Sequence, residues 1–187
     1  MESPHVPPLP EVETERLLLR AMRESDADAL FAMFSDWEVM RYWSRGPWAD
    51  RAEALEHIAR MNAGRANVEY YPWAIATQGD DALIGTMSLF DIQREHGRAQ
   101  VGYSLLPSQQ GKGYATEALR AALHVAFEAL GLQRIEIDID PANVTSRRLV
   151  ERCGAKLEGQ FRRRWFVHGQ WADSVMYGLL REDLIDC

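Results

Sequence analysis

Apolar and polar positions alternate in several stretches of the chain, and this period of two predicts β-strands. The expected strands, in chain order, are Glu13–Met22, Tyr70–Thr77, Leu83–Ile92, Ala99–Leu106, Ile135–Ile139, Lys156–Val167 and Trp171–Leu180. The second, third and fourth follow one another through short turns, which is typical of an antiparallel meander. The last two are joined at His168-Gly169 and predict a closing hairpin.

Apolar residues three or four positions apart predict helices between these strands. Ser25 is the expected N-cap of the first helix, and Asp28 completes a capping box. The second helix is expected over Asp50–Ala63, capped by Asp50 with Glu53 three residues later. The other helices are expected over Thr116–Leu130 and Ser146–Cys153. Because a helix connects them, Ile135–Ile139 should run parallel to Val101–Leu105. The pattern predicts an α+β fold: a mixed, mostly antiparallel sheet of about seven strands with helices on both faces.

The composition is that of an ordinary globular protein, with 47% hydrophobic and 26% charged residues in a chain of 187. This length suits one domain, which we expect over residues 11–187 after a flexible arm at residues 1–10. The proline-rich start has neither the basic end nor the apolar core of a secretory signal. No apolar run approaches the ~20 residues that span a bilayer.

Charge and cysteine content narrow the class of protein further. The formal net charge is −7, which argues against a nucleic-acid-binding protein, because such proteins are usually basic. The two cysteines, Cys153 and Cys187, are not clustered. We therefore expect free thiols, a reducing cytoplasmic compartment and no zinc or other metal site.

The stretch from Pro107 to Ala115 carries the strongest chemical signal, between an expected strand and an expected helix. Gly111 and Gly113 let backbone N–H groups approach an anion closely, and the start of the helix adds about half a positive charge. A strand, a loop with paired glycines and a helix start together predict a phosphate-binding site. A tight strand-to-helix turn without a ligand is the alternative.

Two common phosphate-binding motifs do not fit this loop. The Walker motif needs four residues between its glycines, but only Lys112 separates Gly111 from Gly113. The dinucleotide motif needs a third glycine where Thr116 stands. The segment Gln110-Gly111-Lys112-Gly113-Tyr114-Ala115 instead resembles the Q/R-x-x-G-x-G/A signature of the GNAT N-acetyltransferases, whose loop holds the pyrophosphate of acetyl-CoA.

Further segments resemble the same superfamily, in the same order along the chain. Asn143-Val144-Thr145-Ser146 is similar to its Asn-x-x-Ser motif, and Arg148–Ala155 is similar to the short helix that follows. Other segments resemble the RimJ and RimL branch, which includes enzymes that acetylate the N-termini of ribosomal proteins. These segments are Thr14–Arg20, Asp26–Leu30, Val39–Tyr42 and His168–Tyr177. The resemblance runs from about Thr14 to about Leu184.

The resemblance implies a GNAT fold in which the strands before and after the helix that follows the loop splay apart, with acetyl-CoA in the notch. The pantetheine arm would pair with the backbone of Ser104, Leu105 and Leu106, as an added strand does. Asn143 would contact the same arm. The pyrophosphate would be held by N–H groups from Gln110, Gly111, Lys112, Gly113, Tyr114 and Ala115. The Lys112 ammonium either neutralises a phosphate or is solvated.

The implied reaction is direct attack of an amine on the thioester. A backbone N–H near Leu105 is the implied oxyanion donor. Ser146 is the implied acid that protonates the CoA sulfur, although serine and asparagine before a helix usually act as caps. Tyr103 and Tyr114 are alternative acids, and Tyr114 also suits a packing role.

The general base is harder to assign. Many relatives carry Glu where Gln100 stands, and a Gln side chain does not accept a proton at neutral pH. Glu136 and Asp138 share one face of their strand, where they either form a carboxylate pair or face solvent. Asp91 and His96 are further candidates, and His96 is expected to be exposed in a turn.

The acceptor site has two groups of candidates. The aromatic residues Tyr42, Trp43 and Trp48 either wall an acceptor cleft or pack in the core. Arg162, Arg163 and Arg164 either contact an acidic acceptor or cofactor phosphates, or form a solvated charge run.

Three functions follow from these patterns. The first is an acetyl-CoA-dependent N-acetyltransferase that acts on a protein N-terminus or a small-molecule amine, as a monomer or homodimer, without nucleic acid or membrane. The second is a non-catalytic acyl-CoA-binding sensor or interaction module on the same scaffold, which Gln100 motivates. The third is a nucleotide-binding protein, which the glycine spacing disfavours.

Overall fold

The computed structural model describes residues 10–64 and 70–185 of the chain. The expected flexible arm at residues 1–10 lies outside the described residues except for Pro10, and so does Cys187. Cys153 is buried and forms no disulfide within the described ranges.

One sheet of eight strands organises the fold, in the order β1-β2-β3-β4-β5-β6-β8-β7. The strands are β1 (Val12–Glu13), β2 (Leu17–Arg20), β3 (Tyr71–Thr77), β4 (Leu83–Gln93), β5 (Arg98–Leu105), β6 (Arg134–Ile139), β7 (Lys156–Val167) and β8 (Gln170–Leu180). Neighbouring strands are antiparallel except β5 and β6, which run parallel. The expected mixed, mostly antiparallel sheet is therefore confirmed, with one strand more than expected.

The additional strand arises because a turn interrupts the expected first strand. The Thr14 hydroxyl accepts a hydrogen bond from Leu17 N–H at 3.0 Å, and Thr14 N–H donates to Leu17 O at 2.9 Å. These bonds divide Glu13–Met22 into β1 and β2, which pair with each other. A period of two along the chain does not reveal a turn that side-chain hydrogen bonds create.

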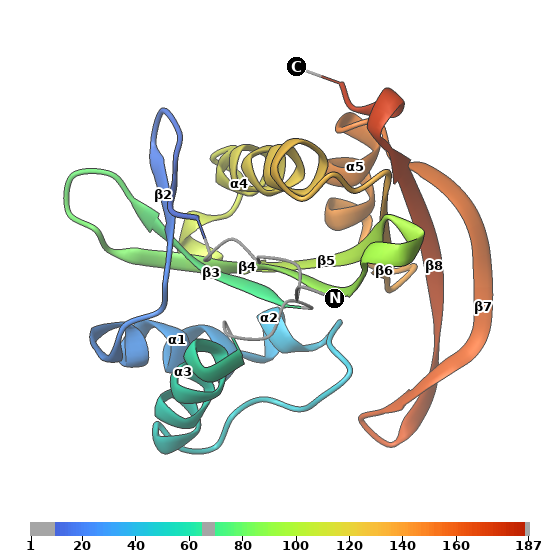
Figure 1. The fold of residues 1–187 in the computed structure, drawn as a ribbon. Coiled ribbons are helices and arrows are strands. Elements are labelled where there is room, and N and C mark those ends of the chain that lie inside the picture. The colour runs from blue at the N-terminus through green and yellow to red at the C-terminus, as the bar shows by residue number, and fades with distance from the viewer. Residues whose placement is uncertain (1–9, 65–69, 186–187) are drawn as a thin grey trace.

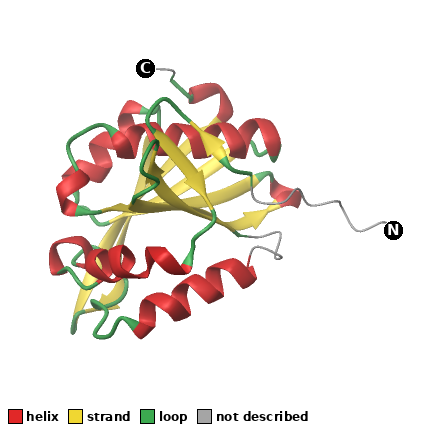
Figure 2. Cartoon of the chain, turned by 90° about the vertical axis from the view of Figure 1, so that its left-hand side faces the viewer, coloured by secondary structure: helices red, strands yellow, loops and turns green. Residues whose placement is uncertain are grey.

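The helices are α1 (Ala27–Phe34), α2 (Trp37–Met40), α3 (Ala52–Gly64), α4 (Tyr114–His124) and α5 (Val144–Arg152). Figures 1 and 2 show helices on both sides of the sheet, with α4 and α5 on one face and α1 and α3 on the other. The expected cap of the second helix is confirmed. Asp50 Oδ1 accepts from Ala52 N–H at 2.8 Å, and Glu53 Oε1 accepts from Ala49 N–H at 2.7 Å.

The expected start of the first helix is wrong. α1 begins at Ala27, after a single 3₁₀ turn at Glu24–Asp26, and neither Ser25 nor Asp28 caps it. The side chain that closes the turn is Asp26, whose carboxylate accepts from Arg23 N–H at 2.8 Å. Asp26 takes this place because its carboxylate is also the partner of a buried arginine.

That arginine, Arg20, has 1% of its surface exposed and ties β2 to the start of α1. Its guanidinium donates to both carboxylate oxygens of Asp26, at 2.8 and 2.9 Å, and its Nε donates to Asp81 at 2.6 Å. The hydrogen bonds to Asp26 raise the pKa of Arg20 further above its ordinary value. A planar, two-point pair of this kind fixes the geometry of both partners.

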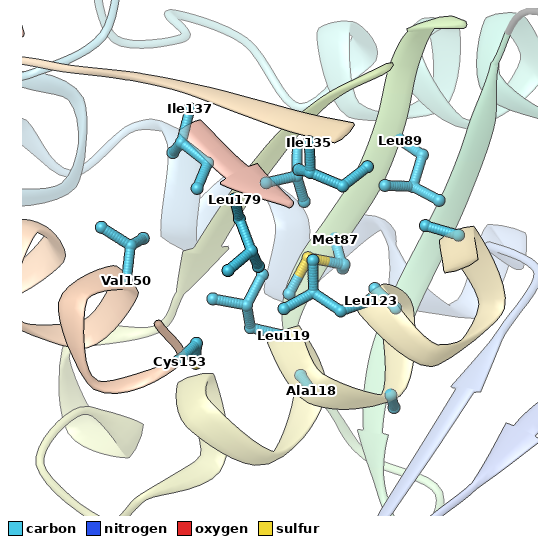
Figure 3. Close-up of a cluster of buried hydrophobic side chains, with 14 of the residues drawn as sticks. Met87, Leu89, Ala118, Leu119, Leu123, Ile135, Ile137, Val150, Cys153 and Leu179 are labelled. Carbon is cyan, nitrogen blue, oxygen red and sulfur yellow. The ribbon is translucent and has the colours of Figure 1, made fainter. Parts of the chain in front are cut away.

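Two hydrophobic clusters fill the space between the sheet and its helices. The larger lies under α4 and α5, and Figure 3 shows Met87, Leu119, Leu123, Ile135 and Leu179 among its members. The smaller lies under α1 and α3 on the opposite face and includes Leu30, Phe34, Met40, Trp48 and Ile58. The sheet is therefore covered on both sides, as an α+β fold with helices on two faces requires.

We expect Asp26→Asn to lower the free energy of unfolding by about 3 kcal/mol, because Arg20 would stay charged and buried without its main partner. Asp28→Asn is the matched control on the same segment. Its carboxylate is 80% exposed and pairs with Arg51 at the surface, so the loss should stay within about 0.5 kcal/mol. Urea unfolding followed by tryptophan fluorescence measures both. Similar losses in the two variants would contradict the role given to the buried pair.

Candidate active site

β5 and β6 are paired only at their beginnings. The last pair joins Gln100 to Glu136, after which β5 continues to Leu105 and β6 to Ile139 with no further pairs between them. The parallel direction is confirmed, and so is the expected splaying of the two strands. Val101–Leu105 is the segment that leaves β6, not the one that pairs with it. We call the opening between these two diverging segments the fork.

Backbone groups of a strand point alternately to its two sides. Leu106 N–H donates to Ile84 O of β4 at 2.9 Å, so Leu106 and, two residues earlier, Ser104 direct their N–H groups toward β4. Tyr103 and Leu105 therefore direct theirs into the fork. Of the three residues expected to pair with a pantetheine arm, Leu105 faces the fork, whereas the N–H groups of Ser104 and Leu106 face away from it.

The loop before α4 has the backbone that the paired glycines predict. Gly111 and Gly113 have left-handed φ angles of 75° and 85°, which glycine adopts without strain. Gly113 is the N-cap of α4, which begins at Tyr114, two residues before the expected Thr116, and no side chain caps this end. The first N–H groups of a helix have no intrahelical acceptor. Tyr114 and Ala115 therefore supply N–H groups of the kind that bind phosphate.

Two other residues of the loop are already engaged. Gln110 N–H donates to Pro107 O at 3.3 Å, so it belongs to the preceding turn and not to the expected ring of phosphate donors. Gln110 Nε2 donates to Leu105 O at 3.3 Å, which ties the loop to the end of β5. Lys112 Nζ donates to Gln109 Oε1 at 3.0 Å on the surface.

Arg16 contacts the same loop, and no sequence pattern assigned it a role. Its Nη1 donates to Lys112 O at 3.0 Å, and its Nε donates to Glu117 at 2.7 Å. Its guanidinium lies 4.7 Å from the centre of the Tyr114 ring, which supports the packing role considered for that tyrosine. Arg16 and Lys112 are 96 residues apart, so no local sequence pattern predicts their contact. The one indication in the sequence is that Arg16 lies within Thr14–Arg20, a segment that resembles the RimJ and RimL branch.

Tyr103 and Ser146 meet across the fork, where their hydroxyl oxygens are 2.7 Å apart. Asn143 caps α5, because its Oδ1 accepts from Ser146 N–H at 3.1 Å. Asn143 is therefore the cap of α5, and the Ser146 hydroxyl forms its hydrogen bond with Tyr103 instead. Burial raises the pKa of Tyr103 to about 12, although the bond to Ser146 acts in the opposite direction. Tyr103 consequently stays protonated near neutral pH, and both hydroxyls carry a proton.

The two carboxylates expected on one strand face have partners of their own. Glu136 accepts from Arg98 and from Arg134, both at 2.9 Å, and Asp138 accepts from Arg164 at 2.8 Å. Their side chains are only 19% and 17% exposed. They are therefore neither a carboxylate pair that shares a proton nor solvent-facing groups. Arg164 is correspondingly an ion-pair partner and not part of a solvated charge run.

The remaining base candidates differ in their surroundings. Asp91 has a left-handed φ of 49° within an irregular stretch of β4, and its Oδ2 accepts from Gln100 Nε2 at 3.0 Å. The His96 side chain is 60% exposed in the turn before β5, as expected. Within the described part of the chain, neither Asp91 nor His96 forms a hydrogen bond with Tyr103 or Ser146.

The three aromatic candidates for the acceptor site have different roles. Trp48 is 6% exposed and packs on Phe34 with ring centroids 4.7 Å apart, and Trp43 meets the same ring edge-on at 5.8 Å. Tyr42 instead extends to the loop between β6 and α5, where its hydroxyl lies 3.5 Å from Ala142 O. Trp43 and Trp48 therefore serve the core, and Tyr42 connects the α2 segment to the wall of the fork.

Over residues 10–64 and 70–185, no three His, Cys, Asp or Glu side chains gather as a metal site requires. None of the helices in the same ranges has the length and apolar character needed to cross a bilayer.

Comparison with protein families identifies the class of this protein. The family model described as "Acetyltransferase (GNAT) domain" matches residues 16–156, and the chain therefore belongs to the GNAT acetyltransferases. The N-acetyltransferase p20 of Bacillus licheniformis is 34% identical over 170 residues, which cover 91% of this chain and 96% of that relative. The chain is an N-acetyltransferase, as the sequence resemblance implied.

Two solved structures are similar over nearly the whole chain. RimJ of Mycobacterium smegmatis, in complex with CoA-disulfide, has a TM-score of 0.81 and 25% identity, and the match covers 91% of this chain and 84% of that one. The spermidine N-acetyltransferase from Vibrio cholerae, in complex with CoA and spermine, has a TM-score of 0.79 and 25% identity, with 91% and 98% covered. These matches confirm the GNAT fold and the resemblance to the RimJ branch.

We expect Gly113→Glu to abolish measurable CoA binding in a calorimetric titration. A Cβ here would be strained by the left-handed φ and would lie 3.2 Å from Arg16 Nη2, and the added carboxylate would repel a diphosphate. Gly79→Glu is the matched control, because Gly79 has a φ of 100° in a turn with open space around it. It should bind CoA like the unchanged protein. Full affinity in Gly113→Glu would refute the placement of the diphosphate.

Proposed function

We propose that this N-acetyltransferase transfers the acetyl group of acetyl-CoA to a primary amine, on a protein N-terminus or a small molecule, by direct attack of the amine on the thioester. The observation that carries the proposal is the Tyr103–Ser146 pair, whose hydroxyls lie 2.7 Å apart across the fork. The pair provides protons at a point that an extended cosubstrate, held by the loop before α4, would reach along β5.

In the proposed complex, the diphosphate binds N–H groups between Gly111 and Ala115, and the pantetheine arm enters the fork beside Leu105. An extended arm pairs with an exposed strand edge as another strand would. Asn143 stands at the start of α5 on the other wall of the fork, where its side-chain NH₂ is a donor for the same arm. The CoA-type ligands in the two similar structures support acetyl-CoA as the cosubstrate.

The residues of the fork suit each stage of the transfer. As the nitrogen of the neutral amine bonds to the acetyl carbon, negative charge develops on the carbonyl oxygen, and Leu105 N–H stabilises it by ~3 kcal/mol. When the carbon–sulfur bond breaks, Ser146 passes its proton to the sulfur, Tyr103 passes its own proton to Ser146, and water then returns a proton to Tyr103. The attacking nitrogen loses its proton to water. The products are an amide and the free thiol of CoA.

Loss of the amine proton determines which acceptors react readily. Gln100 is not a base, and the carboxylates of Glu136 and Asp138 are held by arginines. An α-amino group, with a pKa of ~7.7–8.0, is already partly neutral near pH 7, whereas a lysine side chain at ~10.4 is not. A site without a dedicated base therefore suits an N-terminal or similarly weakly basic amine better than a lysine.

The second candidate function is a non-catalytic acyl-CoA-binding module on the same fold. It is favoured by Gln100, which stands where many relatives carry Glu, and by the engaged state of the neighbouring carboxylates. Tight acetyl-CoA binding without thiol release across a panel of amines, together with a protein partner in pull-downs, would support this alternative. Thiol release with any amine would exclude it.

Ser146→Ala is expected to lower kcat by about 10–100-fold, with little change in the KM for acetyl-CoA, because the lost hydroxyl acts on the leaving sulfur. Thr145→Ala removes the neighbouring exposed hydroxyl and should leave kcat unchanged. Tyr103→Phe should reduce kcat less than Ser146→Ala, because Ser146 keeps its own proton. Release of CoA thiol, followed spectrophotometrically, measures all three. An unchanged kcat in Ser146→Ala would exclude this residue as the acid.

A further inference from the structure

Two arginines on the α1–α3 side of the sheet lack a carboxylate partner among the residues that the structure describes. The half-buried Arg45 stacks its guanidinium on Phe34 and Trp48, 5.2 Å from each ring centroid. The more exposed Arg60 places Nη2 3.1 Å from Nδ1 of His57. We call Arg45, Arg60 and His57 the arginine cluster.

Other arginines of the same region are paired. Arg41 lies 3.1 Å from Glu38, and Arg51 forms an ion pair with Asp28. The carboxylate that most favours the charge of Arg45 is Glu53, but its Oε1 already accepts N–H bonds at the start of α3. Among the described residues, no carboxylate therefore forms an ion pair with either arginine of the cluster.

The electrostatics of the cluster favour an anion. Burial, and next the charge of Arg60, lower the pKa of Arg45. Burial lowers the pKa of His57 to about 4, and both arginines act in the same direction, so this ring is neutral near pH 7. A partly buried charge facing a like charge is unfavourable unless an opposite charge neutralises it. A bound anion would remove this cost.

Contacts connect the cluster to the fork. Burial raises the pKa of Tyr70, whereas its hydrogen bond to Ser88 of β4 and the nearby charges of Arg60 and Arg45 lower it. Ser88 is paired with Gly102 of β5, the residue directly before Tyr103. The arginine cluster is thus linked through Tyr70 and Ser88 to the start of the fork segment of β5, on the face covered by α1 and α3.

The position of the cluster separates it from the cosubstrate phosphates. The loop at Gly111 and Gly113 leads into α4, which covers the opposite face of the sheet (Figure 1). An anion beside Arg45 and Arg60 therefore approaches from the side of the fork away from the diphosphate. That is the side from which an amine must reach a thioester held in the fork.

We propose that Arg45 and Arg60 bind a carboxylate of the amine acceptor, so that the enzyme prefers amines that carry a carboxylate and disfavours polyamines. This inference rests on the proposed function. The carboxylate comes either from an acidic side chain near a peptide N-terminus or from an amino-acid-like small molecule. A guanidinium binds either one by the same two-point hydrogen bonding.

The test compares acceptors with and without a carboxylate. One arm uses three peptide amides with an N-terminal alanine followed by Glu-Glu, Gln-Gln or Lys-Lys. The other arm uses alanine, alaninamide and spermidine. In at least one arm, we expect kcat/KM to be at least about tenfold higher for the acceptor with a carboxylate than for the acceptors without one. The reason is that the arginines form hydrogen bonds to a charged group. Equal values throughout, or a preference for the Lys-Lys peptide or spermidine, would overturn the proposal.

The variants are the double change Arg45→Gln with Arg60→Gln, and Arg51→Gln as the matched control from the same region. The double variant should reduce the preference for carboxylates to within about threefold, because both guanidinium groups are gone. Arg51→Gln should keep the full preference. Thermal unfolding and CoA affinity, measured for each variant, confirm that the fold and the diphosphate site are intact. A preference that survives in the double variant would contradict the proposal.

A binding measurement separates this inference from the proposed function. The acetylated Ala-Glu-Glu and Ala-Gln-Gln peptide amides are titrated into the protein saturated with CoA. We expect tighter binding of the acidic peptide to the unchanged protein and equal binding of both peptides to the double variant. Absence of turnover with every amine would refute the proposed function alone, whereas equal binding of both peptides to the unchanged protein would refute the carboxylate site.

Discussion

The site depends on the separation of β5 and β6. The strands are paired only as far as Gln100 and Glu136, and this paired end is stabilised by Glu136, which accepts from Arg98 and Arg134. Beyond it, the backbone of Val101–Leu105 has no neighbouring strand on one side among the residues that the structure describes. Folded proteins leave backbone groups unpaired only where water, side chains or a ligand satisfy them. The loss of hydrogen bonds within the sheet thereby creates the strand edge at which we propose that the extended cosubstrate binds.

The buried and half-buried charged residues differ in whether they have a partner of opposite charge. Arg20 is buried but has Asp26 and Asp81 as partners, and Glu136 is held between two arginines. These groups are balanced, so they fix the positions of strands and helices. The guanidinium of Arg45 instead rests on aromatic rings. Stacking on the ring faces stabilises this cation, and no carboxylate of the described residues forms an ion pair with it, which is why we propose that it binds an anion.

Signals between residues close in the chain predicted much of the fold. The observed bounds of β7 match the expected strand, and Gly111 and Gly113 have the positive φ angles that a phosphate loop needs. Local patterns did not predict contacts between distant residues. The Tyr103–Ser146 bond spans 43 residues and the Arg16–Lys112 bond spans 96, and neither depends on periodicity or turn chemistry. Ser25 failed as a cap because a tertiary partner, Arg20, engages Asp26.

The hydrogen bond from Arg16 to the carbonyl of Lys112 has a consequence for the geometry of the loop. The carbonyl of Lys112 and the N–H of Gly113 belong to the same rigid, trans peptide unit, in which they point in opposite directions. By orienting the carbonyl toward itself, Arg16 turns that N–H the other way. Arg16, which lies between β1 and β2, thus determines the direction of a donor through a hydrogen bond to the other end of the same peptide unit.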